Sequence, residues 1–179
     1  FVTGRVKPIP SILNKAKQKG IPMDKLEEIQ DIAGLRIMCQ FVDDIMVVVN
    51  LLRNRNDFEI VEERDYISHK KASGYRSYHL VIRYPVQTIT GEKKILAEIQ
   101  IRTLAMNFWA TIEHSLNYKY NGQFPEDIKL RLQRAAEAAF QLDEEMSLIR
   151  GEIQEAQAFY TRKTELQKEK ILRRHENGL

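Results

Sequence analysis

The sequence of 179 residues contains a single cysteine, Cys39. One thiol cannot form a disulfide within the chain, and it argues against a cysteine-rich zinc site. No apolar run approaches the roughly 18 residues that a membrane-spanning helix requires. No signal peptide opens the sequence, and its first residue is Phe1 rather than methionine, so we expect further residues upstream. These absences favour a protein of the reducing cytoplasm with no membrane association.

The sequence also lacks the short motifs of several large enzyme classes. It contains no G-x-x-x-x-G-K-[ST] phosphate loop, no G-x-S-x-G nucleophile motif, no H-E-x-x-H metal motif and no pair of C-x-x-C motifs. If a protein of this sequence handles nucleotides, basic side chains must therefore hold the phosphates. The composition is otherwise that of one globular domain, with 43% hydrophobic and 30% charged residues.

Acidic residues are absent from the segment 1–23, where the basic residues are Arg5, Lys7, Lys15, Lys17 and Lys19. The whole chain has a net charge of +3, so taking away these five positive charges leaves −2 for the remainder. A basic block on a nearly neutral body indicates a site for a polyanion. A solvated helix face would have the same composition, and charge alone does not separate the two interpretations.

Hydrophobic periodicity predicts a mixture of helices and strands. Ser11 is expected to cap a short basic helix that ends near Lys19, and residues 23–30 form a second helical stretch. Four strands are expected at residues 32–41, 58–67, 77–84 and 94–103, the first of them largely buried. Thr90 and Gly91 mark a turn, so the last two strands form a hairpin. Further helices are expected at residues 43–52, at 104–120 before the stop signal Asn121-Gly122, and from 125 to about 170.

Two of these helices carry apolar stripes. In the helix at 104–120 the stripe comprises Ala105, Phe108, Trp109, Ile112 and Leu116. In the final helix, apolar residues alternate in steps of four and three, which is a heptad pattern: Ile128, Leu132, Ala135, Ala139, Leu142, Met146, Ile149, Ile153, Ala156 and Tyr160. The first half of that helix can pack on its own domain. The second half, from about Met146, outruns the domain, and we expect it to contact another subunit.

Two carboxylates stand on separate predicted strands. In the strand at 94–103, Glu98, Gln100 and Arg102 share one face, because side chains alternate between the two faces of a strand. Asp31 directly precedes the most apolar strand. Each acid has a simpler explanation, since Asp31 can cap a turn and Glu98 can face water. A carboxylate on each of two neighbouring strands would nevertheless suit Mg²⁺, which prefers one or two carboxylates together with waters and substrate phosphates.

The segment Ser73-Gly-Tyr-Arg-Ser-Tyr-His79 is dense in groups that stack or donate hydrogen bonds. Gly74 permits a tight turn. An exposed Tyr75 could stack on a base, and Lys71 and His79 could donate to phosphate. Packed tyrosines and a satisfied polar histidine would account for the same residues, and the segment alone leaves both interpretations open.

Four segments occur in a fixed order: Asp31-Ile-Ala-Gly-Leu-Arg-Ile, Ser73-Gly-Tyr-Arg-Ser-Tyr-His79, Ala97-Glu-Ile-Gln-Ile-Arg-Thr103 and Trp109-Ala-Thr-Ile-Glu-His114. The ordered set resembles the synthetase domain of the RelA/SpoT family, and above all the small alarmone synthetases, stand-alone bacterial enzymes that make pppGpp and ppGpp in the stringent response. The resemblance implies an α+β fold of the nucleotidyltransferase type, a mixed sheet of about five strands flanked by helices. Residues 1–124 would form the catalytic domain, and residues 125–179 a helical extension for packing and oligomerisation.

The resemblance also implies roles for individual residues. Asp31 would be a Mg²⁺ ligand, and Glu98 a second ligand or the base that accepts the proton of the acceptor 3′-hydroxyl. The ATP-binding positions would be Arg5 and Arg36, which sandwich adenine, with Lys7, Ser11 and Lys15. The GDP- or GTP-binding positions would be Lys71, Ser73, Tyr75, His79, Gln100, Asn107 and Glu113, with Tyr75 stacked on guanine. Phe1, Thr3 and Gly4 resemble part of a regulatory surface between subunits.

The implied reaction transfers pyrophosphate from ATP to GDP or GTP and releases AMP. The implied partners are these nucleotides, further copies of the chain in a homo-oligomer, most simply a tetramer, and alarmone and single-stranded RNA as regulators. The hydrolase domain of larger family members carries a His-Asp motif, and no His-Asp dipeptide occurs here, so we expect synthesis without hydrolysis. Two other functions fit parts of the sequence, namely a nucleotidyltransferase that releases pyrophosphate and an RNA-binding regulatory module.

Overall fold

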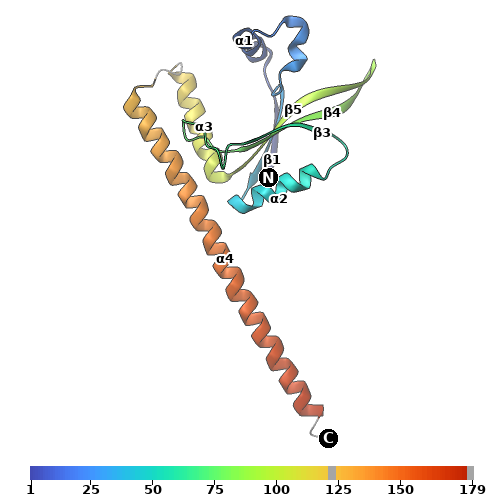
Figure 1. The fold of residues 1–179 in the computed structure, drawn as a ribbon, viewed down its shortest axis with the longest axis vertical. Helices are drawn as coiled ribbons and strands as arrows, with labels where there is room; N and C mark the ends of the chain where they lie inside the picture. The colour runs from blue at the N-terminus through green and yellow to red at the C-terminus, as the bar shows by residue number, and fades with distance from the viewer. Residues whose placement is uncertain (121–123, 177–179) are drawn as a thin grey trace. The chain divides into compact units, whose positions relative to one another are not determined.

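The computed structural model describes residues 1–120 and 124–176, which divide into two compact units, Phe1–Asp143 and Glu144–Leu179. The first unit is built on one five-stranded sheet in the order β1-β2-β5-β4-β3 (Figure 1). The strands are β1 Val2–Val6, β2 Ala33–Cys39, β3 Glu59–Asp65, β4 Tyr78–Thr88 and β5 Gly91–Thr103. The helices are α1 Ile9–Lys19, the 3₁₀ helix η1 Met23–Glu28, α2 Val42–Arg53, α3 Leu104–Lys119 and α4 Glu126–Glu176.

The sheet is mixed, because β2 and β5 run parallel whereas the other neighbouring pairs run antiparallel. This confirms the α+β class that the sequence predicts. The helix α2 covers one face of the sheet. Its fully buried Ile45 and Val49 pack with Leu80, Ile99 and Ile101 in the main core. The polar face of β5 is therefore turned to the opposite side, where a site can form.

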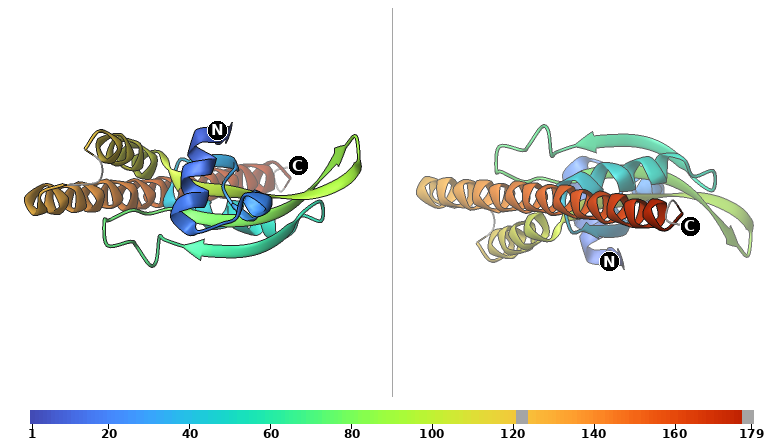
Figure 2. Two further views of the ribbon diagram at one scale, coloured as in Figure 1. Left: turned by 90° about the horizontal axis from the view of Figure 1, so that it is seen from above. Right: turned by 90° about the horizontal axis from the view of Figure 1, so that it is seen from below.

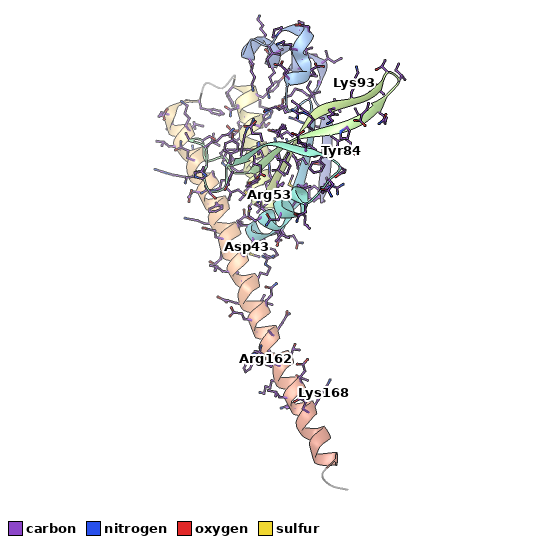
Figure 3. All side chains as sticks on the ribbon, turned by 45° about the vertical axis from the view of Figure 1, so that its right-hand side comes forward. Asp43, Arg53, Tyr84, Lys93, Arg162 and Lys168 are labelled. Carbon is purple, nitrogen blue, oxygen red and sulfur yellow. The ribbon has the colours of Figure 1, made fainter. Side chains whose placement is uncertain are left out.

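The predicted hairpin joins β4 to β5. Thr88 pairs with Gly91, whose φ of 105° lies in the left-handed region that favours glycine. The tip of the hairpin extends away from the central part of the sheet (Figure 2). Figure 3 labels Tyr84 on one arm and Lys93 on the other. Among the described residues, none of the helices combines the length and the apolar character that crossing a bilayer requires.

One strand at the start of the chain was missed, and one expectation there was wrong. Strand β1 was not predicted, because all five of its residues are exposed and its sequence shows no alternation. Ser11 does not cap α1, since the helix begins two residues earlier at Ile9 with Pro8 as its N-cap. The Pro8 carbonyl accepts from the backbone nitrogens of Ser11 and Ile12 at 2.9 and 3.1 Å, which leaves the Ser11 side chain in the exposed first turn.

The stripe predicted for α3 was also wrong in part. Phe108 and Ile112 are 69% and 46% exposed, whereas Met106, Trp109 and Ala110 are buried. The cap explains the difference, because the Thr103 hydroxyl accepts from the Met106 backbone nitrogen at 3.1 Å and thereby fixes the helix's rotation on the sheet. The stop signal at Asn121-Gly122 lies outside the described residues, and α3 ends at Lys119.

The helix α4 begins one residue after Pro125, as predicted. Within the first unit its inward face holds Leu132, Ala136 and Asp143, while Leu142 of the heptad pattern is 57% exposed. The second unit is the remainder of this helix, from Glu144, and it exposes Met146, Ile149, Ile153 and Tyr160. Figure 3 labels Arg162 and Lys168 on this stretch. Contact between subunits along the apolar stripe stays a prediction, as does the domain division at 124/125.

Candidate active site

The candidate site lies on the sheet face opposite α2, where two rows of side chains cross all five strands. Strand register aligns the first row, which consists of Arg64, His79, Gln100, Arg36 and Thr3. The second row lies two residues along each strand and therefore on the same face: Glu62, Val81, Glu98, Gly34 and Arg5. Residues far apart in the sequence thus stand side by side because of register.

Glu98, in the second row, accepts hydrogen bonds from two members of the first row. The Gln100 amide nitrogen donates to its Oε2 at 2.9 Å, and the His79 Nδ1 lies 3.1 Å from its Oε1. Arg64 adds a positive charge at 3.8 Å. Burial alone would raise the pKa of Glu98, but the hydrogen bond and charge of His79 and the bond from Gln100 outweigh it, and the pKa falls to about 2. Glu98 is therefore ionised at neutral pH.

Asp31 lies just before β2 and pairs with two lysines from the basic start of the chain. The Lys7 and Lys15 ammonium groups are 3.0 and 2.7 Å from its Oδ2. Burial opposes ionisation of Asp31, but the two lysines lower its pKa on balance. Its other oxygen, Oδ1, is buried and has no hydrogen-bond partner among the residues that the structure describes. A buried carboxylate oxygen without a partner suits a cation as ligand.

One cavity of about 110 Å³ brings the two carboxylates together with Arg5 and Arg36. Its lining is Thr3, Gly4, Arg5, Asp31, Gly34, Leu35, Arg36, Glu98 and Gln100. No group of three or more acidic, histidine or cysteine side chains gathers as a metal centre within the described part of the chain. Two carboxylates fit Mg²⁺, which commonly takes only one or two from the protein and completes its shell with water and phosphate. The two carboxylates that line this cavity are therefore of the kind and number that this ion takes from a protein.

A second cavity of about 320 Å³ adjoins the first, since Arg5, Arg36 and Gln100 line both. Its other lining residues are Tyr75, Arg102, Ala110, Thr111, Glu113 and His114. The side-chain oxygen of Gln100 accepts from Arg36 Nε at 3.2 Å and also from Arg102. Gln100 therefore stands between a cavity with the two carboxylates and a cavity with the tyrosine.

Tyr75 is held by its hydroxyl rather than exposed. That hydroxyl lies 2.8 Å from His79 Nε2 and accepts from Arg102 at 3.0 Å. Burial raises the pKa of the Tyr75 hydroxyl, although the charge of Arg102 works against the rise. The Lys71 ammonium group lies 4.5 and 5.0 Å from the ring centroids of Tyr66 and Tyr75. His79 is 6% exposed and bridges Tyr75 and Glu98.

The remaining predicted residues are less closely joined to these cavities. Ser73 is exposed, and its hydroxyl accepts from the Tyr75 backbone nitrogen at 3.4 Å. Glu113 lines the second cavity and accepts from Asn117. Asn107 has a buried Oδ1 without a partner among the described residues. Ser11 lies on the exposed first turn of α1, four residues before Lys15 and hence on the same side of the helix. Phe1 is 70% exposed, whereas Thr3 and Gly4 line the first cavity.

Three residues of the site are not among the predicted catalytic or binding residues. Arg102 is 3% exposed, and burial lowers the pKa of its guanidinium. Its place on the polar face of β5 was visible in the alternation of that strand. Arg64 and the Tyr66 ring, whose centroid is 5.2 Å from that of His79, come from the end of β3 and the loop beyond it. Only the pairing of β3 with β4 brings them to the site, and no local pattern signals that pairing.

Comparison with known proteins gives consistent matches. A protein-family model, described as the region found in RelA/SpoT proteins, matches residues 4–123 of this chain. The GTP pyrophosphokinase YjbM of Bacillus subtilis is 70% identical over 163 residues, which are 91% of this chain and 77% of the relative.

Solved structures agree with the sequence matches. The small alarmone synthetase 1 of Bacillus subtilis, bound to its product pppGpp, superposes with a TM-score of 0.84 at 70% identity, covering 86% of this chain and 79% of that one. The same synthetase bound to AMPCPP gives a TM-score of 0.75 at 65% identity, covering 87% and 78%.

Proposed function

The chain belongs to the RelA/SpoT family, and on that premise we propose that it is a GTP pyrophosphokinase of the small alarmone synthetase type. It makes pppGpp or ppGpp by moving the β,γ-pyrophosphate of ATP to the 3′-hydroxyl of GTP or GDP, with AMP as the other product. The observation that carries the assignment of residues is the pair of adjoining cavities. One holds Asp31 and Glu98, the other holds Tyr75, and Arg5, Arg36 and Gln100 line both.

The proposed donor side is the first cavity. Arg5 and Arg36 project from β1 and β2 with guanidinium planes suited to stacking on adenine. Lys7 and Lys15, with Ser11 on the same side of α1 as Lys15, would face the phosphates. Asp31 and Glu98 would hold Mg²⁺, which when bound neutralises charge on the phosphoryl group in transfer. Both lysines pair with Asp31 here, so they would exchange this partner for phosphate oxygens when ATP enters.

The proposed acceptor side is the second cavity together with the loop before β4. Tyr75 would stack on guanine, with Lys71, Ser73 and His79 toward the phosphates and Gln100, Asn107 and Glu113 around the nucleoside. The 3′-hydroxyl oxygen then attacks the β-phosphorus and gives up its proton to solvent, the bond from that phosphorus to the α-phosphate oxygen breaks, and AMP departs with that oxygen. Most of the protein's contribution is positioning two polyanions and screening their repulsion.

The lowered pKa of Glu98 bears on the two roles that this residue could have. A general base works best when its pKa lies near the operating pH. The pKa of about 2 makes Glu98 fully charged but weakly basic. This favours Glu98 as a holder of charge, that is as a metal ligand, over Glu98 as the acceptor of the 3′-hydroxyl proton.

Product analysis tests the proposed reaction. The protein is incubated with ATP, Mg²⁺ and either GDP or GTP, and the nucleotides are separated by anion exchange. AMP and a pentaphosphate or tetraphosphate of guanosine are expected. Release of pyrophosphate instead would indicate a nucleotidyltransferase, and salt-dependent RNA binding without turnover would indicate an RNA-binding module. Incubation with ppGpp and Mn²⁺ should release no pyrophosphate, because the sequence contains no His-Asp dipeptide.

We further propose a cytoplasmic homo-oligomer, most simply a tetramer, assembled along the exposed apolar stripe of α4 that includes Met146, Ile149 and Ile153. Alarmone and single-stranded RNA are the proposed regulators, and the exposed Phe1 with Thr3 and Gly4 is the proposed regulatory surface. Truncation at Gly151 followed by light scattering tests the assembly, and an unchanged mass would count against it.

A further inference from the structure

The loop between β3 and β4, residues 66–77, carries Lys71, Ser73 and Tyr75. We name it the acceptor loop. Its own backbone hydrogen bonds are few: Gly74 donates to Lys71 at 2.8 Å, Lys71 to Tyr75 at 3.2 Å and Tyr66 to Ser77 at 3.1 Å. A loop of this length that carries binding groups must be held by a rigid neighbour if those groups are to keep their places.

The first turns of α4 lie beside this loop (Figure 1) and contact it at its centre. Gln133 donates from Nε2 to the Ala72 carbonyl oxygen at 2.7 Å. One turn along the helix, Ala136 meets Gly74 so closely that a Cβ placed on Gly74 would stand 2.6 Å from the Ala136 Cβ. The loop backbone at residues 72–74 therefore rests directly on the helix.

A third α4 residue braces both flanks of the same loop. Glu137 pairs with Lys70 at 2.7 Å and with Arg76 at 3.0 Å. Arg76 is 8% exposed, and its guanidinium carbon lies 3.9 Å from the centroid of the Phe140 ring. Gln133 and Glu137, four residues apart, thus face the loop from one side of the helix.

The bracing stretch of α4 is itself fixed to the rest of the first unit. The Trp109 indole nitrogen of α3 donates to the Leu132 carbonyl at 2.9 Å. At the other end of the stretch, the Thr103 hydroxyl donates to the buried Asp143. The loop is consequently held by an element tied at two points to α3 and to the end of β5.

From these contacts we infer that the stretch of α4 from Leu132 to Asp143 is a positioning element for the acceptor nucleotide, with Gln133 and Glu137 as its positioning residues. The inference rests on the proposed function, because it takes Lys71, Ser73 and Tyr75 as acceptor contacts. None of the donor-side residues Arg5, Lys7 and Lys15 lies on this loop. Loosening the brace therefore weakens binding of GDP or GTP and leaves ATP binding intact.

Steady-state kinetics of the full chain test the inference. For Gln133→Ala, the KM for GDP or GTP at saturating ATP should rise about fivefold, the equivalent of losing one hydrogen bond of about 1 kcal/mol. Glu137→Gln, which removes the negative charge that pairs with Lys70 and Arg76, should raise it severalfold. The KM for ATP should stay within a factor of about two, because the donor residues are untouched.

Two substitutions of the same kind on exposed positions of the same helix serve as controls. Gln141→Ala and Glu144→Gln should leave both KM values at those of the parent protein, since both side chains are exposed and neither takes part in the bracing contacts described above. Thermal melting of all four variants separates local loosening from unfolding. An unchanged acceptor KM in both Gln133→Ala and Glu137→Gln, or an equal rise in the KM for ATP, would overturn the inference. Absence of product from the parent protein would instead defeat the proposed function.

Discussion

Replacement of Asp31 by asparagine tests two interactions of this carboxylate, its ion pairs with the two lysines and its proposed binding of Mg²⁺. In the structure Asp31 forms ion pairs with Lys7 and Lys15, whose side chains are 15% and 28% exposed. In the working enzyme both lysines would turn to the phosphates of ATP, and the carboxylate would turn to Mg²⁺. Asparagine keeps the size of the side chain, but it removes the charge on which both interactions depend.

The magnitude follows from the pairs that are broken. An ion pair at an exposed position contributes about 0.2–1 kcal/mol of free energy. The Lys7–Asp31 and Lys15–Asp31 pairs are more than half buried, so we assign about 1 kcal/mol to each. Without Asp31, an ATP analogue no longer has to displace this carboxylate from the two lysines. Metal-free analogue should therefore bind about 30-fold more tightly to Asp31→Asn, the equivalent of about 2 kcal/mol. Turnover should nevertheless fall at least ~100-fold, because the carboxylate that would hold the metal is lost.

Isothermal titration of a non-hydrolysable ATP analogue, with and without Mg²⁺, measures both effects. In the parent protein Mg²⁺ should strengthen binding, and in Asp31→Asn this gain should vanish. Asp24→Asn is a matched control, because Asp24 is an exposed acid on the neighbouring 3₁₀ helix. The reasoning fails if Asp31→Asn retains the gain from Mg²⁺, or if its metal-free affinity equals that of Asp24→Asn.

Three further predictions concern the core of the site and its supports. Gly74→Ala should lower stability by ~1–3 kcal/mol in chemical denaturation, because φ is 92° and the added Cβ would stand 2.6 Å from that of Ala136. Tyr78 has a pKa raised to about 12, first by burial and then by its hydrogen bond to Glu63. Because the pKa of Tyr78 in the folded protein lies above the ordinary value of 10, protonated Tyr78 stabilises the folded state. This stabilisation is complete below pH 10 and is lost as the pH rises through 12. Denaturation curves should thus show ~2–3 kcal/mol lost across that window, and Tyr78→Phe should abolish the loss. Glu98→Gln should reduce AMP formation at least ~100-fold with an unchanged circular dichroism spectrum, and turnover within tenfold of the parent would exclude Glu98 from the metal site.

The sequence predicted those parts of the fold that rest on local periodicity. Alternation along β5 placed Ile99 and Ile101 on one face and Glu98 and Gln100 on the other, and the structure confirms both faces. A period of two leaves no other arrangement once the strand is recognised. The β4–β5 hairpin followed from its turn residues for a similar reason.

Other parts depend on tertiary contacts that local patterns do not contain. Strand β1 is held by pairing with β2, and its exposed residues give no alternation by which to find it. In α3 the predicted stripe included Phe108, Trp109 and Ile112, but only Trp109 of these is buried, and its neighbour Ala110 is covered with it. Propensity and periodicity cannot anticipate which side of α3 is buried, because Ala136 and Leu132 of α4 pack against Trp109 and Ala110.

The site depends on local periodicity and on tertiary contacts. The sequence could therefore indicate its residues one by one, but not which of them contact one another. Arg64 pairs with His79, His79 with Gln100 and Gln100 with Arg36, so one row of the sheet crosses four strands that the chain visits in another order. Gln100 donates to Glu98 and accepts from Arg36 and Arg102, which makes it the only member of the described row that contacts both the carboxylate and the arginines of the two cavities. Because neighbouring strands lie about 4.8 Å apart, register fixes how far donor and acceptor groups stand from one another. A shift of one residue between β2 and β5 would turn Arg36 away from Gln100, so the proposed transfer depends on the same pairing that holds the core together.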